Sequence, residues 1–234
     1  MNAFDLAIQT WLVHVGSSSF VFTHTIHAIY DFYIVKGLIP LAILCALWFK
    51  PGDSQEWRRE MVVATLCSGL VAFVVGRVSA LALPFRLRPI YTPGLQQMFP
   101  FSNEMGSGLR FWSSFPSDHA AIWMAIAVGI FCVWRWVGVL AMVQCVLCIC
   151  LPRIYLGLHY PTDVIAGVVI GALCAWFLTR ASIRRRYAPV VVGFMERQPT
   201  VAYMLAFLFL FEFATMFDEP RMFVALVIKN LKHH

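Results

Sequence analysis

Two clusters of ionisable side chains in this chain have the residue types and spacing that phosphoryl transfer needs. Arg153, His159 and Asp163 follow one another at spacings of six and four residues, and His119 lies upstream in a Pro-Ser-Asp-His sequence. An arginine binds phosphate oxygens, one histidine can act as nucleophile and the other as acid, and a carboxylate can orient one of the rings. This chemistry does not require a metal ion. Both clusters lie at the ends of apolar runs, where ionisable groups are functional by default.

The local sequence predicts how each cluster is held. Pro161 favours a helix that starts near Thr162, which places Asp163 in its first turn. We expect Asp163 to accept the Nδ1 proton of His159, so that Nε2 is free to attack. Another helix is expected to start at Ser117, and the free N–H groups of its first turn form an anion site. Each feature alone also fits a structural role, as an N-cap or an interfacial side chain, but their coincidence favours a functional site.

The composition is that of a polytopic membrane protein. Of the 234 residues, 60% are hydrophobic and 13% are charged, whereas soluble domains are about one quarter charged. Six runs are apolar and long enough to span a bilayer, which takes about 20 residues. They cover residues 32–49, 61–83, 117–134, 137–156, 162–179 and 200–217. The expected fold is all-α: one transmembrane helical bundle over residues 1–234, with about six spans and an amphipathic interfacial helix at residues 1–16.

The basic residues lie in alternate connections between these runs. The net charge of +6 is dispersed at the ends of apolar runs, which argues against nucleic acid and favours the bilayer and an anionic lipid as partners. The basic residues in question are Lys50, Arg58, Arg59, Arg135, Arg180, Arg184, Arg185 and Arg186. The positive-inside rule assigns their connections to the cytoplasm, so both clusters face the periplasm or exterior. The long connection 84–116 lies on that outer side, and loops of such length are often functional lids.

Two other segments carry no predicted chemistry. Cys145, Cys148 and Cys150 have a spacing that resembles a metal site, but they are embedded in Val, Leu and Ile. We interpret them as buried small hydrophobes and expect neither a metal nor a cofactor. Residues 218–234 are too short for a further span and end in basic residues, so we expect a surface segment there.

The motifs resemble the signature of the type-2 phosphatidic acid phosphatase superfamily of integral-membrane lipid phosphatases. That signature has three parts: Lys-x6-Arg-Pro, Pro-Ser-Gly-His and Ser-Arg-x5-His-x3-Asp. Residues 152–163 match the third part, with Pro in place of the usual Ser, and residues 116–119 match the second, with Asp118 in place of Gly. The resemblance covers residues 77–171.

The first part of the signature is matched only at its end, by Arg88 and the proline that follows it. Leu81 stands where the signature has lysine. If the segment bends at Pro84, either Arg77 or Arg86 supplies the missing positive charge.

The resemblance implies a role for each matched residue. His159 would form a phosphohistidine, Asp163 would orient it, and His119 would protonate the leaving group and then activate water. The phosphoryl oxygens would be bound by backbone amides and by Arg88, Arg153 and Ser117.

Within the superfamily, the external site, the six-span layout and the form Phe-Pro-Ser-Asp-His are most like bacterial undecaprenyl diphosphate phosphatases of the inner membrane. These enzymes recycle the carrier lipid of cell-wall synthesis. Phosphatidylglycerophosphate, phosphatidate and lipid A phosphatases share the motifs, and a lipid phosphotransferase would use the same phosphohistidine. A transporter of an anionic lipid is the non-enzymatic alternative. Lys36, inside the first apolar run, fits a transporter, but binding alone does not need a nucleophile and an acid.

Overall fold

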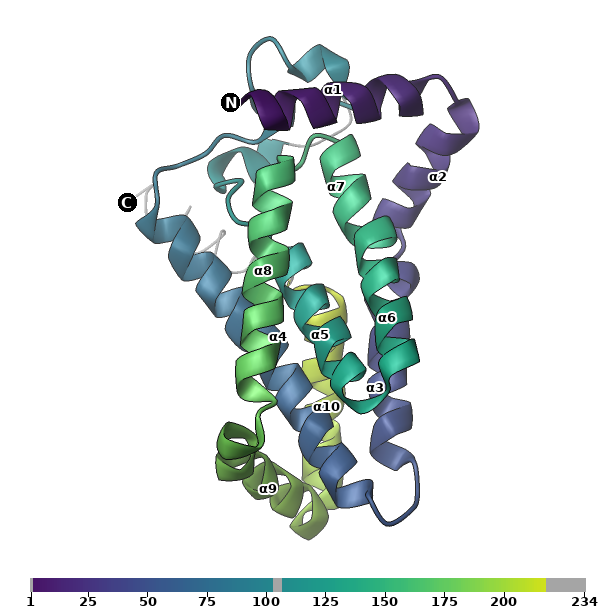
Figure 1. Ribbon diagram of the computed structural model, residues 1–234, viewed down its shortest axis with the longest axis vertical. Coiled ribbons are helices and arrows are strands. Elements are labelled where there is room, and N and C mark those ends of the chain that lie inside the picture. Colours follow the sequence, from purple (N-terminus) through teal and green to yellow (C-terminus); the bar gives the residue numbers. More distant parts are fainter. Residues whose placement is uncertain (1, 103–106, 218–234) are drawn as a thin grey trace, which may run out of the picture.

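The regular structure of the chain is helical, which confirms the predicted all-α class. The computed structural model describes residues 2–102 and 107–217, so the predicted surface segment 218–234 lies outside the described residues, among which no strand occurs. The α-helices (Figure 1) are α1 (Ala3–Ser17), α2 (Phe20–Asp31), α3 (Ile39–Phe49), α4 (Gln55–Ala82), α5 (Asp118–Val133), α6 (Arg135–Gln144), α7 (Leu151–Tyr155), α8 (Pro161–Leu178), α9 (Ala181–Arg197) and α10 (Pro199–Ala214).

Short segments of other helix types join these elements. The π-helical segment Ile34–Leu38 leads into α3, and a second one, Cys145–Cys150, connects α6 to α7 without a break. The described part of the long connection between α4 and α5 contains three 3-10 turns, at Pro89–Tyr91, Gln96–Met98 and Ser107–Phe111.

Membrane-spanning helices are present, but not all six predicted runs reach spanning length. Among the described residues, three helices are long and apolar enough to cross a bilayer: α4, the continuous run Arg135–Tyr155, and α8. A fourth arises if α2 and the helix Ile34–Phe49, which meet at an angle of 67°, count as one span. Both α5 and α10 are apolar but have 16 residues each. The chain is therefore a membrane protein in which three or four of the predicted spans have full length.

The short helix α5 lies at the centre of the bundle, between α8 and α6 in the view of Figure 1, and also packs against α4. Its side chains are buried on all sides, as an apolar helix surrounded by other helices requires. Contact between α5 and α8 depends on Gly167 and Gly171. A Cβ atom at these positions would lie 2.4 Å from the carbonyl oxygen of Ser117 and 2.1 Å from that of Ala121. The two glycines therefore form a small-xxx-small contact that lets the helices approach closely.

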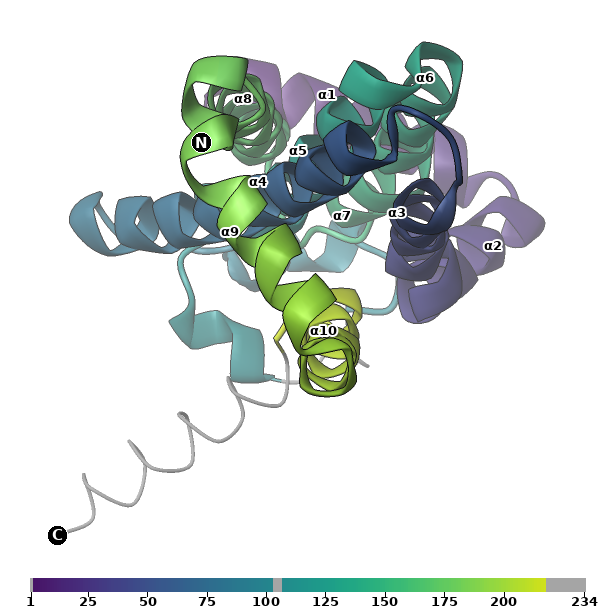
Figure 2. The ribbon, with the colours of Figure 1, turned by 90° about the horizontal axis from the view of Figure 1, so that it is seen from below.

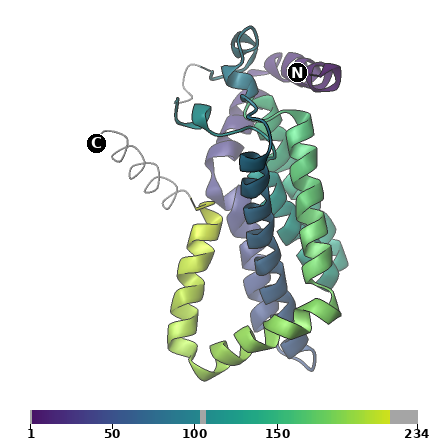
Figure 3. The same ribbon diagram turned by 90° about the vertical axis from the view of Figure 1, so that its left-hand side faces the viewer.

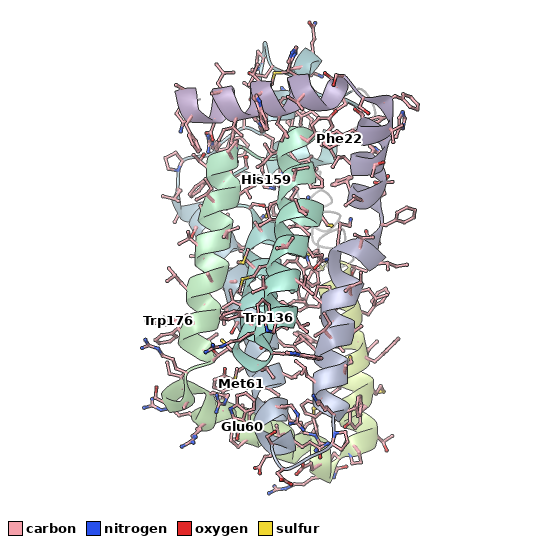
Figure 4. All side chains as sticks on the ribbon, turned by 45° about the vertical axis from the view of Figure 1, so that its right-hand side comes forward. Phe22, Glu60, Met61, Trp136, His159 and Trp176 are labelled. Atoms are coloured by element: carbon pink, nitrogen blue, oxygen red, sulfur yellow. The ribbon has the colours of Figure 1, made fainter. Side chains whose placement is uncertain are left out.

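Two helices lie across the ends of the bundle (Figures 1 and 2). The predicted N-terminal helix is confirmed as α1, which crosses one end, and α9 crosses the other. From α9 the chain turns into α10, which stands at one side of the bundle (Figure 3). The guanidinium of Arg184 on α9 is bound to Glu60 of α4, with Nε 3.0 Å from Oε2. Glu60 and His159 lie at opposite ends of the molecule (Figure 4), so the basic α9 and the predicted site are separated by the length of the bundle.

Candidate active site

A cavity of about 630 Å³ brings the two clusters together at the α1 end of the bundle. It is bordered by the end of α2, by α4, by the start of α5, by the α7–α8 connection and by the end of α10. The ionisable side chains in its lining include Asp31, Lys36, Arg77, Arg88, Asp118, His119, Arg153 and His159. Both predicted histidines and three of the predicted arginines therefore face one space.

The hydrogen bonds of His159 fix its tautomer. Its Nδ1 lies 2.8 Å from the backbone carbonyl oxygen of Ser114, which can only accept, so Nδ1 carries the proton. Its Nε2 lies 3.2 Å from Nη1 of Arg88, which can only donate. Nε2 therefore presents its lone pair next to a guanidinium, where a nucleophile for a phosphoryl group has to be.

The surroundings of His159 favour the neutral ring. The side chain is 3% exposed, and burial, followed by the positive charges of Arg88 and Arg153, holds its pKa well below the usual 6.5. Since only the unprotonated ring is nucleophilic, these effects keep His159 in its reactive form at neutral pH.

Asp163 acts on His159 differently from the predicted direct hydrogen bond. Its Oδ2 lies 3.9 Å from Nδ1, too far for a hydrogen bond. Instead, Oδ2 accepts from the hydroxyl of Ser114 and, at 2.9 Å, from the backbone N–H of Tyr160. Because the carbonyl of Ser114 is the acceptor for Nδ1, the carboxylate holds the residue that orients the ring.

Arg88 and Arg153 form the basic wall beside His159. Arg88 Nη1 also donates to the carbonyl oxygen of Leu158 at 2.9 Å. Burial, and after it the charge of Arg153, lowers the pKa of Arg88 to about 10, which leaves the guanidinium cationic at neutral pH. The guanidinium carbon of Arg153 lies 5.7 Å from the ring centroid of Tyr30. Two nearby buried cations are costly on their own and favour an anion between them.

The two arginines considered as substitutes for the missing lysine have different positions. Arg77 lines the cavity and binds Asp118 through both ends of its guanidinium, with Nε 2.9 Å from Oδ1. Arg86, by contrast, is not part of the cavity lining. It lies behind the site and binds the carboxylates of Asp5 and Asp163.

Ser117 and His119, at the start of α5, also differ in whether they face the cavity. His119 lines the cavity. Ser117 does not: its side chain is fully buried, and its amide donates to the carbonyl oxygen of Asp163 at 3.0 Å. Neither the side chain nor the amide of Ser117 is directed at the cavity in this arrangement, so the prediction of Ser117 as a phosphate ligand is not supported.

Lys36 is a cavity residue that the motif analysis did not place in the site. Its ammonium lies 5.2 Å from the ring centroid of Tyr30 and 4.6 Å from that of Tyr33. The Tyr30 ring is thus shared by Lys36 and Arg153. The signal in the sequence was a lysine within an apolar run, since such residues usually serve a function.

Both carboxylates of the cavity lining have a side-chain partner. Asp118 is paired with Arg77, and Oδ2 of Asp31 lies 3.0 Å from Nδ1 of His27. Among the described residues, no three His, Cys, Asp or Glu side chains come together in a way that could hold a metal ion. The lining is therefore suited to an anion.

A family model described as the PAP2 superfamily matches residues 57–187, which is more than half of the chain. The chain belongs to this superfamily. The range matched to the PAP2 model contains both histidines of the cavity and its three arginines, whereas α1 and Lys36 lie before it.

Several characterised proteins share part of this sequence. The bacitracin transport permease protein BcrC of Bacillus licheniformis is 30% identical over 51% of this chain and 55% of its own length. The lipid A 4′-phosphatase of Bacteroides thetaiotaomicron is 34% identical over 39% of this chain and 40% of its own. The undecaprenyl-diphosphatase BcrC of Bacillus subtilis is 27% identical over 66% of this chain and 74% of its own. The chain thus spans about half or less of the first two relatives. No solved structure matches it.

Proposed function

We propose that this protein is an integral-membrane lipid phosphatase that hydrolyses undecaprenyl diphosphate to undecaprenyl phosphate and inorganic phosphate. The observation that carries the proposal is the Nε2 atom of His159, unprotonated and 3.2 Å from Arg88, in a cavity shared with His119. Membership of the PAP2 superfamily and the names of two phosphatase relatives support it.

The proposed reaction has two steps. In the first, the Nε2 lone pair of His159 attacks the terminal phosphorus, the bridging P–O bond breaks, and His119 gives a proton to the departing lipid phosphate. In the second, His119 takes a proton from water, whose oxygen attacks the phosphohistidine and releases inorganic phosphate. Arg88 and Arg153 bind the oxygens of the transferred group, on which the charge is spread in the transition state. Acid–base catalysis by His119 is worth about 10²–10⁴ in rate.

The cationic side chains of the cavity support a diphosphate as the substrate. Arg77 is neutralised by Asp118, so Arg88 and Arg153 match one phosphoryl group, which carries a charge of about −1.5 to −2. Lys36 adds a further cation against the Tyr30 ring that Arg153 also contacts. Because Lys36 lies beside Arg153 in this lining, we propose that the second phosphate of the substrate binds there.

The proposed location is the bacterial inner membrane, with the site on the outer face. The basic residues of α9 lie at the end of the bundle opposite His159 (Figure 4), and the positive-inside rule places such residues in the cytoplasm. An outward site would act on lipid phosphates exposed in the outer leaflet.

The test is phosphate release by detergent-purified protein from undecaprenyl diphosphate, phosphatidate, phosphatidylglycerophosphate and lipid A, each with and without EDTA. We expect the highest kcat/KM for undecaprenyl diphosphate and equal rates with EDTA, since Asp118 is paired with Arg77 and the described residues of the cavity bring no three His, Cys, Asp or Glu side chains together. A preference for another lipid would change the substrate and keep the mechanism. Loss of activity in EDTA that Mg²⁺ restores would overturn the metal-independent mechanism. Binding of all four lipids without release of phosphate would favour the transporter.

A further inference from the structure

The N-terminal helix α1 buries polar side chains and exposes apolar ones. Asp5 and Gln9, one turn apart on α1, are both 0% exposed, whereas Trp11 is 64% exposed and Phe4 is 50% exposed. In a membrane protein the apolar face of such a helix meets lipid, so its polar face belongs to the protein interior. A buried carboxylate is costly unless it is paired and hydrogen-bonded, so the partners of Asp5 indicate what this face is for.

Asp5 binds the first turn of the helix that follows the nucleophile. Its Oδ1 accepts from the backbone N–H of Thr162 at 2.9 Å, and its Oδ2 accepts from the Thr162 hydroxyl at 2.8 Å. The same Oδ2 lies 2.6 Å from Nη2 of Arg86. Asp5 thereby supplies an acceptor to an N–H group at the start of α8, where such groups lack an intrahelical partner.

Gln9 reaches the nucleophile itself. Its Nε2 donates to the backbone carbonyl oxygen of His159 at 3.2 Å. The loop there leaves helical geometry at Gly157, which has a φ of +70°. The N–H groups of Leu158 and His159 both turn back to the carbonyl of Arg153. The contact from α1 therefore restrains the nucleophile from outside its own loop.

A second route connects α1 to the imidazole. Arg86 bridges the carboxylates of Asp5 and Asp163. Asp163 accepts from the Ser114 hydroxyl, and the Ser114 carbonyl accepts from Nδ1 of His159. The helix thus contacts both the backbone and, through this chain of hydrogen bonds, the ring of the nucleophile.

We propose that Asp5 and Gln9 are positioning residues of the active site, which hold the loop 159–162 so that Nε2 of His159 is directed at the phosphoryl group. This inference rests on the proposed function, in which His159 is the nucleophile. A displacement of about 1 Å in a reacting atom can cost about 10² in rate, so the contribution of α1 should be seen in the chemical step.

The test compares Asp5→Asn and Gln9→Met with Thr10→Ala, a change to an exposed neighbour on the same helix. Each substitution at Asp5 or Gln9 keeps the size of the side chain and removes the charge or the donor. We expect kcat and the single-turnover rate of phosphohistidine formation to fall about 10–100-fold. KM should stay within about twofold, because the phosphate ligands are untouched. Thr10→Ala should match the wild type in every measurement.

Thermal unfolding in detergent separates positioning from folding. If Asp5→Asn does not fold, Gln9→Met decides, because it removes one hydrogen bond and no charge. Wild-type rates in a folded variant would overturn the inference. A rise in KM as large as the fall in kcat would overturn it too. Failure of the proposed function is distinguishable, since the wild type would then release no phosphate or His159→Ala would remain active.

Discussion

At the residue scale, the proposed roles of the two histidines can be separated by mutation. His159→Ala should abolish both phosphate release and the covalent intermediate, because it removes the Nε2 lone pair next to Arg88. His119→Ala should still form the phosphoenzyme from a substrate with a good leaving group, while its hydrolysis slows about 10²–10⁴-fold. Acid quench with labelled substrate measures both species. A phosphoenzyme trapped in His159→Ala would reverse the two roles.

Lys36 should distinguish diphosphates from monophosphates. Lys36→Met keeps the length of the side chain and removes the cation that shares the Tyr30 ring with Arg153. Charge-assisted contacts of this kind are worth about 1.5–3 kcal/mol, so kcat/KM for undecaprenyl diphosphate should fall at least about tenfold. The value for undecaprenyl phosphate should change little. An equal loss for both lipids would assign Lys36 to the first phosphate or to folding.

The pH dependence should reflect the environment of His159. Burial and the charges of Arg88 and Arg153 lower its pKa, so the neutral ring persists as the pH falls below 6.5 and is lost only at a lower value. The acid limb of kcat/KM that belongs to the enzyme should therefore have its midpoint below pH 6.5. Profiles of kcat/KM against pH for a diphosphate and a monophosphate identify that limb. A limb caused by the enzyme is the same with both substrates, whereas one caused by the substrate differs. A common midpoint above 6.5 would contradict the assignment.

At the element scale, the contact between α5 and α8 sets the position of both clusters, since α5 begins at the residue before His119 and α8 begins two residues after His159. Gly171→Ala places a Cβ against the Ala121 carbonyl oxygen and should destabilise the protein by about 1–3 kcal/mol. Gly193→Ala in α9 is the matched control, because no atom lies within 4 Å of its added Cβ. Gly193→Ala should leave the free energy of unfolding unchanged or raise it by about 0.4–1 kcal/mol. Equal melting temperatures for the two variants in detergent would show that the close approach is not required.

At the scale of the whole molecule, the prediction concerns sidedness. Gln97 in the long connection and Ser182 at the start of α9 are both exposed. They belong to segments at opposite ends of the bundle (Figure 1). In a background without native cysteines, Gln97→Cys should react with a membrane-impermeant maleimide in intact cells, and Ser182→Cys only after permeabilisation. The opposite pattern would place the site in the cytoplasm, and the recycling of an outer-leaflet carrier lipid would then be wrong.

The sequence by itself determined the features that depend on residue type and local spacing. Long apolar runs need helices whose backbone groups are satisfied internally, so the all-α bundle followed from composition, and the spacing of Arg153, His159 and Asp163 marked the site. The number of full-length spans could not be predicted from the sequence. The helix α5 is apolar on all sides because other helices surround it, although it has only 16 residues. Apolar runs at the centre of a bundle and runs that face lipid look alike in a sequence.

Only the tertiary structure decided which arginine faces the cavity. Arg77 and Arg86 were equivalent candidates in the sequence, yet Arg77 lines the cavity and Arg86 lies behind it between two carboxylates. Asp5 meets Thr162 across 157 residues of chain. Contacts of such sequence separation are set by how helices pack against each other, and no local pattern encodes them. The chemistry of the site is therefore local in sequence, whereas its positioning is a property of the folded bundle.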